Sequence, residues 1–242
     1  MNTKTAGLLL LAILISFFGG FYVANSLNKA ELNLLRGEAG RVMTPSNEPE
    51  QTLSAEEIQQ RLTQADANPN NLQFQKSLGL ALYRYASMKQ DTKLLSEVSR
   101  LLLRVYEKNP EDREVEITLG NLYFDIGYFQ KDNENLKKAQ QYYQNILAKT
   151  PEDVDVRTDY GLTYFLQKPA DYDKAAAEFR KSLETDPKHE KTLRFLIQTL
   201  LKQEKMPEAE SYLARLKEVN PNTESLSEIR VLMEREESNS SQ

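Results

Sequence analysis

From about residue 54 onward, apolar residues recur every three or four positions, in segments that short polar stretches separate. This is the spacing of amphipathic α-helices, and the segments come in pairs. One complete pair lies between the turns that contain Pro110 and Pro151, and the polar residues 131–134 divide it. The pattern therefore predicts two helices joined by a short turn.

The helical pair is repeated along the chain. The turn prolines, spaced by 41, 41, 36 and 34 residues, are Pro69, Pro110, Pro151, Pro187 and Pro221. A glycine follows ten residues after each of the first three prolines, and Ile197 takes that place after the fourth. Internal periodicity of this size is typical of a solenoid, in which each pair buries its apolar face by stacking on its neighbours.

Within the complete pair, Leu119-Gly120-x-x-Tyr123 lies on the first helix and Ala139-x-x-x-Tyr143 on the second. These residues resemble the tetratricopeptide repeat (TPR) family, whose usual unit is about 34 residues long. The resemblance covers roughly residues 70 to 221 and implies an all-α TPR superhelix, an α-solenoid of antiparallel helix pairs. The family's small-residue position is occupied here by Val98, Ala139, Ala175 and Ala209, and its large-residue position by Leu102, Tyr143, Phe179 and Leu213.

The first two repeats are seven residues longer than the usual unit. Seven residues make about two helical turns, so one added turn in each helix keeps every side chain on its own face. We therefore predict longer helices there and no long loop. Gly79, Gly120 and Gly161 fall in the middle of helices, where glycine costs about 1 kcal/mol relative to alanine, so we expect them to allow close helix contact.

Residues 7–24 form an uncharged apolar stretch near the N-terminus. A transmembrane helix needs about 20 such residues. A cleaved signal peptide is the alternative, although Ala24-Asn25-Ser26 fits a cleavage site poorly. We predict an uncleaved N-terminal transmembrane helix, one that can continue to residue 36.

The charges on either side of this segment leave its orientation open. Lys4 lies on one side, whereas Lys29, Arg36 and Arg41 lie on the other. The positive-inside rule alone favours a cytoplasmic repeat domain. Bacterial proteins that resemble this layout usually export the large C-terminal domain, so we predict an extracytoplasmic (periplasmic) domain and keep the cytoplasmic one as the alternative.

The polar, proline-containing stretch after the anchor is typical of a linker. Ser54 and Glu57 have the form of a capping box at a helix start. After the last repeat, Leu226, Ile229 and Met233 are expected to close the apolar end of the solenoid. The predicted divisions are an N-terminal tail 1–6, the anchor 7–24, a linker 37–53, a TPR domain 54–237 and a disordered tail 238–242. Within the TPR domain we predict repeats at about 70–110, 111–151, 152–187 and 188–221, with capping helices 54–67 and 223–237.

Composition argues against several classes of function. The net charge of −5 and the pI near 5.2 disfavour a nucleic-acid surface. The chain has no cysteine, which excludes thiolate metal sites and cysteine nucleophiles. Its single histidine, His189, is expected to be a solvated residue in the first turn of a helix. We predict no catalytic residue, no metal site, no cofactor and no small-molecule substrate.

The TPR resemblance implies a concave groove lined by the first helix of each pair. One version of the family binds a C-terminal carboxylate through a Lys and an Asn four residues apart, but Leu80 follows Lys76 here, so an acidic C-terminal tail is not the expected ligand. The candidate groove instead combines an acidic middle with aromatic residues and a basic end, which suits an extended peptide that has apolar and basic groups. Ordinary packing and solvated faces are the alternative. The candidate contact residues are Lys76, Asn121, Phe124, Asp125, Thr158, Asp159, Phe165, Lys191, Arg194 and Gln198.

Three functional hypotheses follow. The first is a membrane-anchored TPR scaffold that binds a protein or peptide partner in its groove and is not an enzyme. The second is an accessory factor for assembly of an envelope complex, resembling the anchored TPR subunits of cytochrome c maturation systems. The third is an enzyme or transport component, for which the sequence offers no constellation of catalytic residues. A homo-oligomeric structural protein is a further possibility, because an uncapped repeat edge can stack on a copy of itself.

Overall fold

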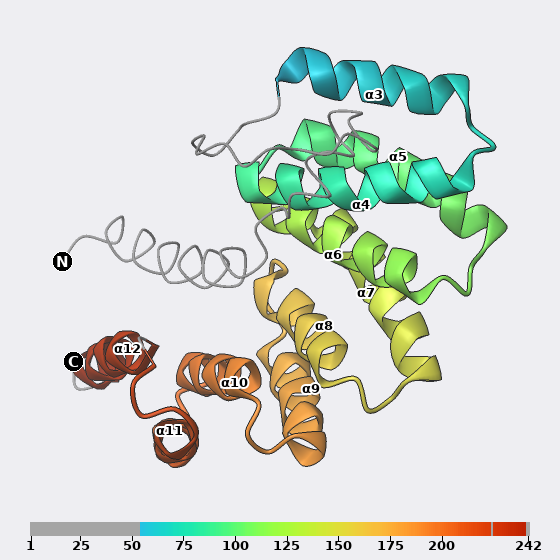
Figure 1. Ribbon diagram of the computed structural model, residues 1–242. Helices are drawn as coiled ribbons and strands as arrows, with labels where there is room; N and C mark the ends of the chain where they lie inside the picture. Colours follow the sequence, from blue (N-terminus) through green and yellow to red (C-terminus); the bar gives the residue numbers. More distant parts are fainter. Residues whose placement is uncertain (1–53, 224, 241–242) are drawn as a thin grey trace, which may run out of the picture. The chain divides into compact units, whose positions relative to one another are not determined.

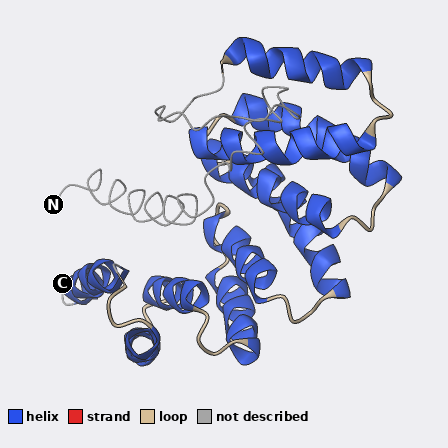
Figure 2. Cartoon of the chain, viewed as in Figure 1, coloured by secondary structure: helices blue, strands red, loops and turns tan. Residues whose placement is uncertain are grey.

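The computed structural model describes residues 54–223 and 225–240 (Figure 1). Within these residues the structure is all-α, with ten helices and no strand (Figure 2). In chain order the helices are α3 (Ala55–Ala67), α4 (Leu72–Lys89), α5 (Thr92–Lys108), α6 (Arg113–Gln130), α7 (Asn133–Lys149), α8 (Val154–Leu166), α9 (Tyr172–Thr185), α10 (Glu190–Lys202), α11 (Met206–Val219) and α12 (Ser225–Ser240).

The anchor and the linker predicted from the sequence lie outside the described residues. Among the residues that are described, no helix has the length and the apolar composition that a membrane crossing requires.

The prediction of longer helices in the first two repeats is confirmed. Helices α4 to α7 have 18, 17, 18 and 17 residues, whereas α8 to α11 have 13, 14, 13 and 14. The connecting turns remain short throughout. The additional residues therefore lengthen the helices by about one turn each, as the helical repeat requires if the apolar faces are to stay in register.

Local side-chain caps define where the helices begin. The capping box at α3 is present: Glu57 N donates to Ser54 Oγ at 3.1 Å, and Ser54 N donates to Glu57 Oε2 at 2.8 Å. Several later helices start after an aspartate whose carboxylate accepts from backbone amides of the first turn. These contacts satisfy amides that have no partner inside the helix. The capping aspartates are Asp91, Asp132, Asp153 and Asp171.

The chain divides into two compact units, whose boundary lies between Asp125 and Ile126, inside α6. In the first unit, α4 packs against α5, and Val98 and Leu102 are fully buried at the small- and large-residue positions. An ideal Cβ on Gly79 would lie 2.6 Å from Leu102 Cδ2. The glycine therefore allows the close helix contact that we expected.

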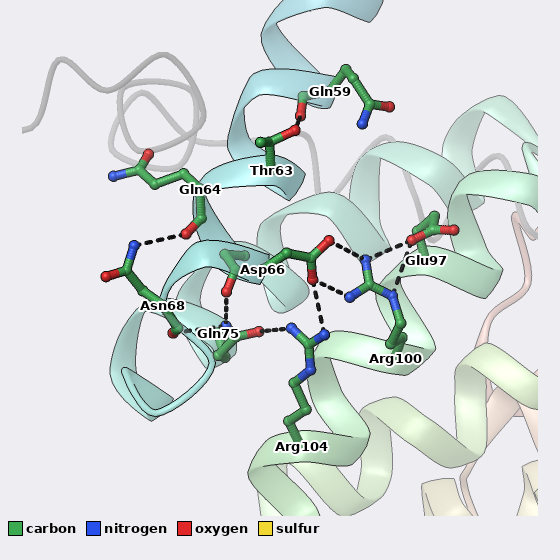
Figure 3. Close-up of polar contacts among 10 residues, drawn as sticks. Gln59, Thr63, Gln64, Asp66, Asn68, Gln75, Glu97, Arg100 and Arg104 are labelled. Carbon is green, nitrogen blue, oxygen red and sulfur yellow. Dashed lines mark hydrogen bonds and ion pairs between the residues drawn. The ribbon is translucent and has the colours of Figure 1, made fainter.

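Helix α3 is joined to the rest of the first unit by polar contacts at its C-terminal end (Figure 3). The Asp66 carboxylate forms ion pairs with Arg100 and with Arg104 of α5. Gln75 Nε2 of α4 donates to the Ala65 carbonyl oxygen at 2.6 Å. The Asn68 backbone amide also donates to that carbonyl oxygen, at 3.2 Å, so Gln75 adds a second donor, from α4, to the last turn of α3.

In the second unit, α7 packs on α8, α8 on α9, α9 on α10 and α10 on α11. The small residues Ala139, Ala175 and Ala209 are fully buried. The Phe179 ring stacks on Phe195, with centroids 6.2 Å apart and planes at 24°.

Helix α12 also packs on α10 and α11. Its side chains Leu226, Ile229 and Met233 are 8%, 1% and 8% exposed. The expectation that these three residues are covered at the end of the last repeat is confirmed.

Candidate functional site

The predicted groove residues lie on the first helices of the pairs, α4, α6, α8 and α10. The chain forms two compact units, and the residues of each are described within their own unit. The first unit holds Lys76, Asn121, Phe124 and Asp125. The second holds Thr158, Asp159, Phe165, Lys191, Arg194 and Gln198.

In the first unit, Lys76 is neutralised by carboxylates of the same unit. Its Nζ lies 2.8 Å from Asp112 Oδ2 and 2.9 Å from Glu114 Oε2. Burial lowers the pKa of Lys76, but hydrogen bonds to these two carboxylates outweigh it and leave the pKa above its usual value. A ligand carboxylate would have to compete with both for this ammonium group.

Two neighbouring candidates of α6 are packing residues in this structure. Phe124 and Asp125 are 4% and 3% exposed. The Asp125 carboxylate accepts a hydrogen bond from Tyr83 Oη at 3.0 Å and another from Ser87 Oγ, both on α4. Asn121 is partly exposed. The buried carboxylate thus joins α4 to α6, and its contact with a ligand stays a prediction.

In the second unit, α8 and α10 bring two acid–base pairs together. Lys191 Nζ lies 2.5 Å from Asp159 Oδ1, and His189 Nε2 lies 3.2 Å from Asp155 Oδ1. Asp155 and Asp159 are one turn apart on α8, so both carboxylates lie on the same side of that helix. We call these four residues, Asp155, Asp159, His189 and Lys191, the α8–α10 face.

The two carboxylates of the α8–α10 face differ in their environment. The Asp155 side chain is 79% exposed, and a hydrogen bond from His189 lowers its pKa. Burial raises the pKa of Asp159, and Lys191 opposes that rise. Asp155 is therefore the accessible anionic group, whereas Asp159 is held in a pair with Lys191.

The expectation for His189 is wrong. Its side chain is only 20% exposed, and the residue is the N-cap of α10. Besides Asp155, its ring contacts the Thr192 hydroxyl, with Nδ1 and Oγ1 2.6 Å apart. The tertiary contact with α8, which sequence spacing does not reveal, covers most of the imidazole.

Asp155, His189 and Thr192 do not form an accessible nucleophilic site. Thr192 is fully buried, and its hydroxyl lies 2.6 Å from that of Thr158, which is also fully buried. A nucleophile must reach its substrate. The hydroxyl chain therefore links α8 to α10 structurally.

The other candidates of the second unit are largely covered. Phe165 packs edge-on against Tyr172 and Phe195, at centroid distances of 5.6 and 6.4 Å. Burial lowers the pKa of Arg194, and the charges of Glu228 of α12 and Glu190 of α10 oppose that shift. Gln198 lies one turn further along α10 and is 6% exposed. Among the ten predicted residues, the partly exposed ones are Lys76, Asn121, Asp159, Lys191 and Arg194.

The sequence contained one signal for His189. The N-cap of α4 is Asn71 and that of α8 is Asp153, each two residues after its turn proline. His189 holds the same place after Pro187, so the repeat register predicts an N-cap there. No comparable signal pairs His189 with Asp155, because their contact depends on how α8 and α10 pack.

Comparison with known proteins agrees with the repeat architecture. The family model for the middle TPR-like domain of cilia and flagella-associated protein 70 matches residues 129–234. The domain is TPR-like. The match covers less than half of the chain. A search of curated proteins finds no match to the chain.

Solved structures show the same fold for the TPR-like domain. MamA residues 41 to the end, from Desulfovibrio magneticus RS-1, is 15% identical, with a TM-score of 0.54, and the match covers 70% of this chain and 86% of that one. TTC0263, a thermophilic TPR protein in Thermus thermophilus, is 16% identical, with a TM-score of 0.52, covering 74% and 88%. At this identity the likeness concerns the fold alone. TPR-like domains are typical of protein-interaction scaffolds.

Proposed function

We propose that this protein is a non-catalytic interaction scaffold that binds an extended peptide segment of a protein partner on the α8–α10 face. The observation that carries the proposal is the exposed Asp155 carboxylate beside the Asp159–Lys191 pair. A surface with both charge types can bind a peptide through paired contacts and can exclude partners of the wrong charge.

The chemistry of the face favours a peptide with a basic side chain. The lowered pKa of Asp155 keeps its carboxylate ionised near neutral pH. A lysine or arginine of the peptide would pair with it, and the exposed part of the carboxylate would lose little solvation on binding.

The test is selection of a displayed peptide library on the purified full-length chain in detergent. We expect the selected peptides to share a basic residue. In fluorescence anisotropy, Asp155→Lys should weaken the binding of a selected peptide roughly tenfold, which corresponds to about 1.4 kcal/mol of binding free energy. The reason is that an attraction of about 1 kcal/mol or less is replaced by a repulsion of similar size.

Glu210→Lys is the matched control, because it makes the same charge change at an exposed position near the start of α11. It should leave the affinity within about twofold. The start of α11 follows the C-terminal end of α10, whereas His189 and Lys191 lie at its N-terminal end, about 20 Å away along the helix, and exposed charges that far apart are screened. Equal loss in both variants would mean that only net charge matters, and the α8–α10 face would not be the binding site. Selection of peptides without basic residues would also contradict the proposal.

We also propose that residues 7–24 anchor the protein in a membrane, with the TPR-like domain outside the cytoplasm. The support is the uncharged apolar stretch, which has about the length of a membrane span. The test is a pair of C-terminal fusions, one to a reporter active only outside the cytoplasm and one to a reporter active only inside. Activity of the internal reporter alone would reverse the proposed orientation, and recovery of the chain in the soluble fraction would reject the anchor.

A further inference from the structure

We propose that α10 carries a second binding face, which α12 covers in the resting chain and which accepts an acidic amphipathic helix of a protein partner. In this view α12 is an intramolecular substitute for the partner helix. The face is centred on Arg194 and Gln198 of α10. Neither residue belongs to the α8–α10 face. A failed peptide selection on that first face would therefore not affect the second.

Helix α12 shows which chemistry the face accepts. Its buried residues Leu226, Ile229 and Met233 are spaced three and four apart, which places them on one stripe of the helix. Glu228 precedes Ile229 in the sequence but lies off this stripe, because successive helical residues point about 100° apart. Its negative charge acts on Arg194. A partner helix with the same arrangement, an apolar stripe and one carboxylate beside it, would make the same contacts.

The face has one unsatisfied polar group, on Gln198. Gln198 lies one turn beyond Arg194 on α10, and its side chain is 6% exposed. Among the described residues, Gln198 Oε1 is buried and has no hydrogen-bond partner. A buried acceptor without a partner loses its hydration and gains nothing in return. A partner helix that brings a donor to this oxygen would gain affinity that α12 does not have.

Burial of Arg194 adds to the cost of covering the face. Desolvation lowers the pKa of its guanidinium group, and Glu228 of α12 and Glu190 of α10 oppose that shift. The structure therefore places a partly desolvated cation one turn from an unsatisfied amide oxygen on α10. A ligand that donates a hydrogen bond to Gln198 Oε1 would satisfy that oxygen.

The turn before α12 has its own attachment to the domain. Glu190 accepts hydrogen bonds from Asn220 Nδ2 at 3.0 Å and from Thr223 Oγ1 at 2.6 Å. The attachment holds the start of α12 near the face even when the helix lifts. A tethered helix competes at an effective concentration of about millimolar, so a partner must bind more tightly than α12 does.

The first experiment releases α12 in the full-length chain by Ile229→Asp, because Ile229 is 1% exposed and a charge there opposes packing. The probe is a fluorescent synthetic peptide with the sequence of residues 223–240. We expect the released chain to bind it at least about tenfold more tightly than the unmodified chain, whose own α12 competes. Val231→Asp is the matched control, since Val231 is 53% exposed on the same helix, and it should bind the probe as the unmodified chain does.

The second experiment tests the charge contact in the released chain. Adding Arg194→Glu to the released chain should weaken its affinity for the probe peptide roughly fivefold. A probe peptide carrying Glu228→Lys should recover that loss on the Arg194→Glu chain. Recovery would support a defined docking of the helix on α10, whereas equal binding of both peptides would overturn it.

Hydrogen exchange of the unmodified chain gives a result that does not depend on any variant folding. We expect the amides of α12 to exchange through an opening that leaves α10 and α11 protected. Protection of α12 equal to that of α11 would overturn the proposal, because a helix that opens only with the whole domain cannot be exchanged for a partner. Equal gains of probe binding by Ile229→Asp and Val231→Asp would overturn it as well.

Discussion

At the scale of single residues, two glycines decide how closely paired helices approach. An ideal Cβ on Gly161 would lie 2.6 Å from Phe179 Cε1, and one on Gly79 would lie 2.6 Å from Leu102 Cδ2. The two neighbours differ in how far they can move. The Phe179 ring is fully buried and stacked on Phe195. Leu102 is also fully buried, with Cγ 2.9 Å from the ideal Cβ on Gly79, but its side chain can turn about two single bonds.

We therefore predict that Gly161→Ala destabilises the domain more than Gly79→Ala. Overpacking typically costs about 1–3 kcal/mol, and the better helix propensity of alanine returns about 1 kcal/mol. Thermal unfolding followed by circular dichroism should show a clear decrease in Tm for Gly161→Ala and a smaller change for Gly79→Ala. The reverse order would contradict the assignment of the rigid contact to Phe179.

At the scale of elements, the two outer helices are held by different means. Helix α3 is tied to α5 through the Asp66 carboxylate, which contacts Arg100 and Arg104 (Figure 3). A hydrogen bond from Arg100 is the largest reason why the pKa of Asp66 is lowered from its ordinary value of 3.8. Helix α12 is held chiefly by the burial of three apolar side chains against α10 and α11.

This difference predicts a pH-dependent contribution of α3. Because the folded pKa of Asp66 is lowered, its carboxylate stabilises the fold above pH 3.8 and loses that contribution as the pH falls through the folded pKa. Asp66→Asn should therefore lower the free energy of unfolding at pH 6.5, by less than about 1 kcal/mol because the pair is half exposed. Urea unfolding followed by circular dichroism at several pH values would measure this difference in the free energy of unfolding.

The gap between the unmodified chain and Asp66→Asn should close as the pH falls well below 3.8. Glu184→Gln, at an exposed position of α9, is the control, and it should track the unmodified chain at every pH. A gap that stays constant down to the acid range would show that Asp66 acts through packing and not through its charge.

At the scale of the whole molecule, contacts are made mainly between neighbouring helices within each of the two units. Stability in such an array is close to a sum of local terms and nearest-neighbour terms. Damage to one helical pair should therefore spread to its neighbours before it reaches the far end of the chain.

Leu82→Ala offers a direct test, because Leu82 is fully buried in α4. A leucine-to-alanine change in a core costs about 2–5 kcal/mol. In hydrogen exchange we expect the amides of α3, α4 and α5 to lose protection, while those of α10 and α11 keep most of theirs. Uniform loss along the chain would instead indicate a single cooperative domain.

The sequence by itself determined the features that depend on neighbours along the chain. Periodicity and the turn prolines predicted the helices, and a seven-residue excess predicted their extra turns, because helical geometry is local. The capping box was predicted from the local motif of Ser54 and Glu57. The small residues such as Ala175 were predicted from their place in the repeat. The apolar stripe of α12 also predicted that Ile229 is covered.

Only the tertiary structure decided which candidate groove residues are accessible and what they contact. Phe124 and Thr158 are buried, His189 binds Asp155, and the charge of Glu228 of α12 acts on Arg194. Each of these outcomes depends on the distance and rotation between helices that are far apart in sequence. Repeat spacing places a residue on a helix face, but it does not say which side chain from the next helix meets it there.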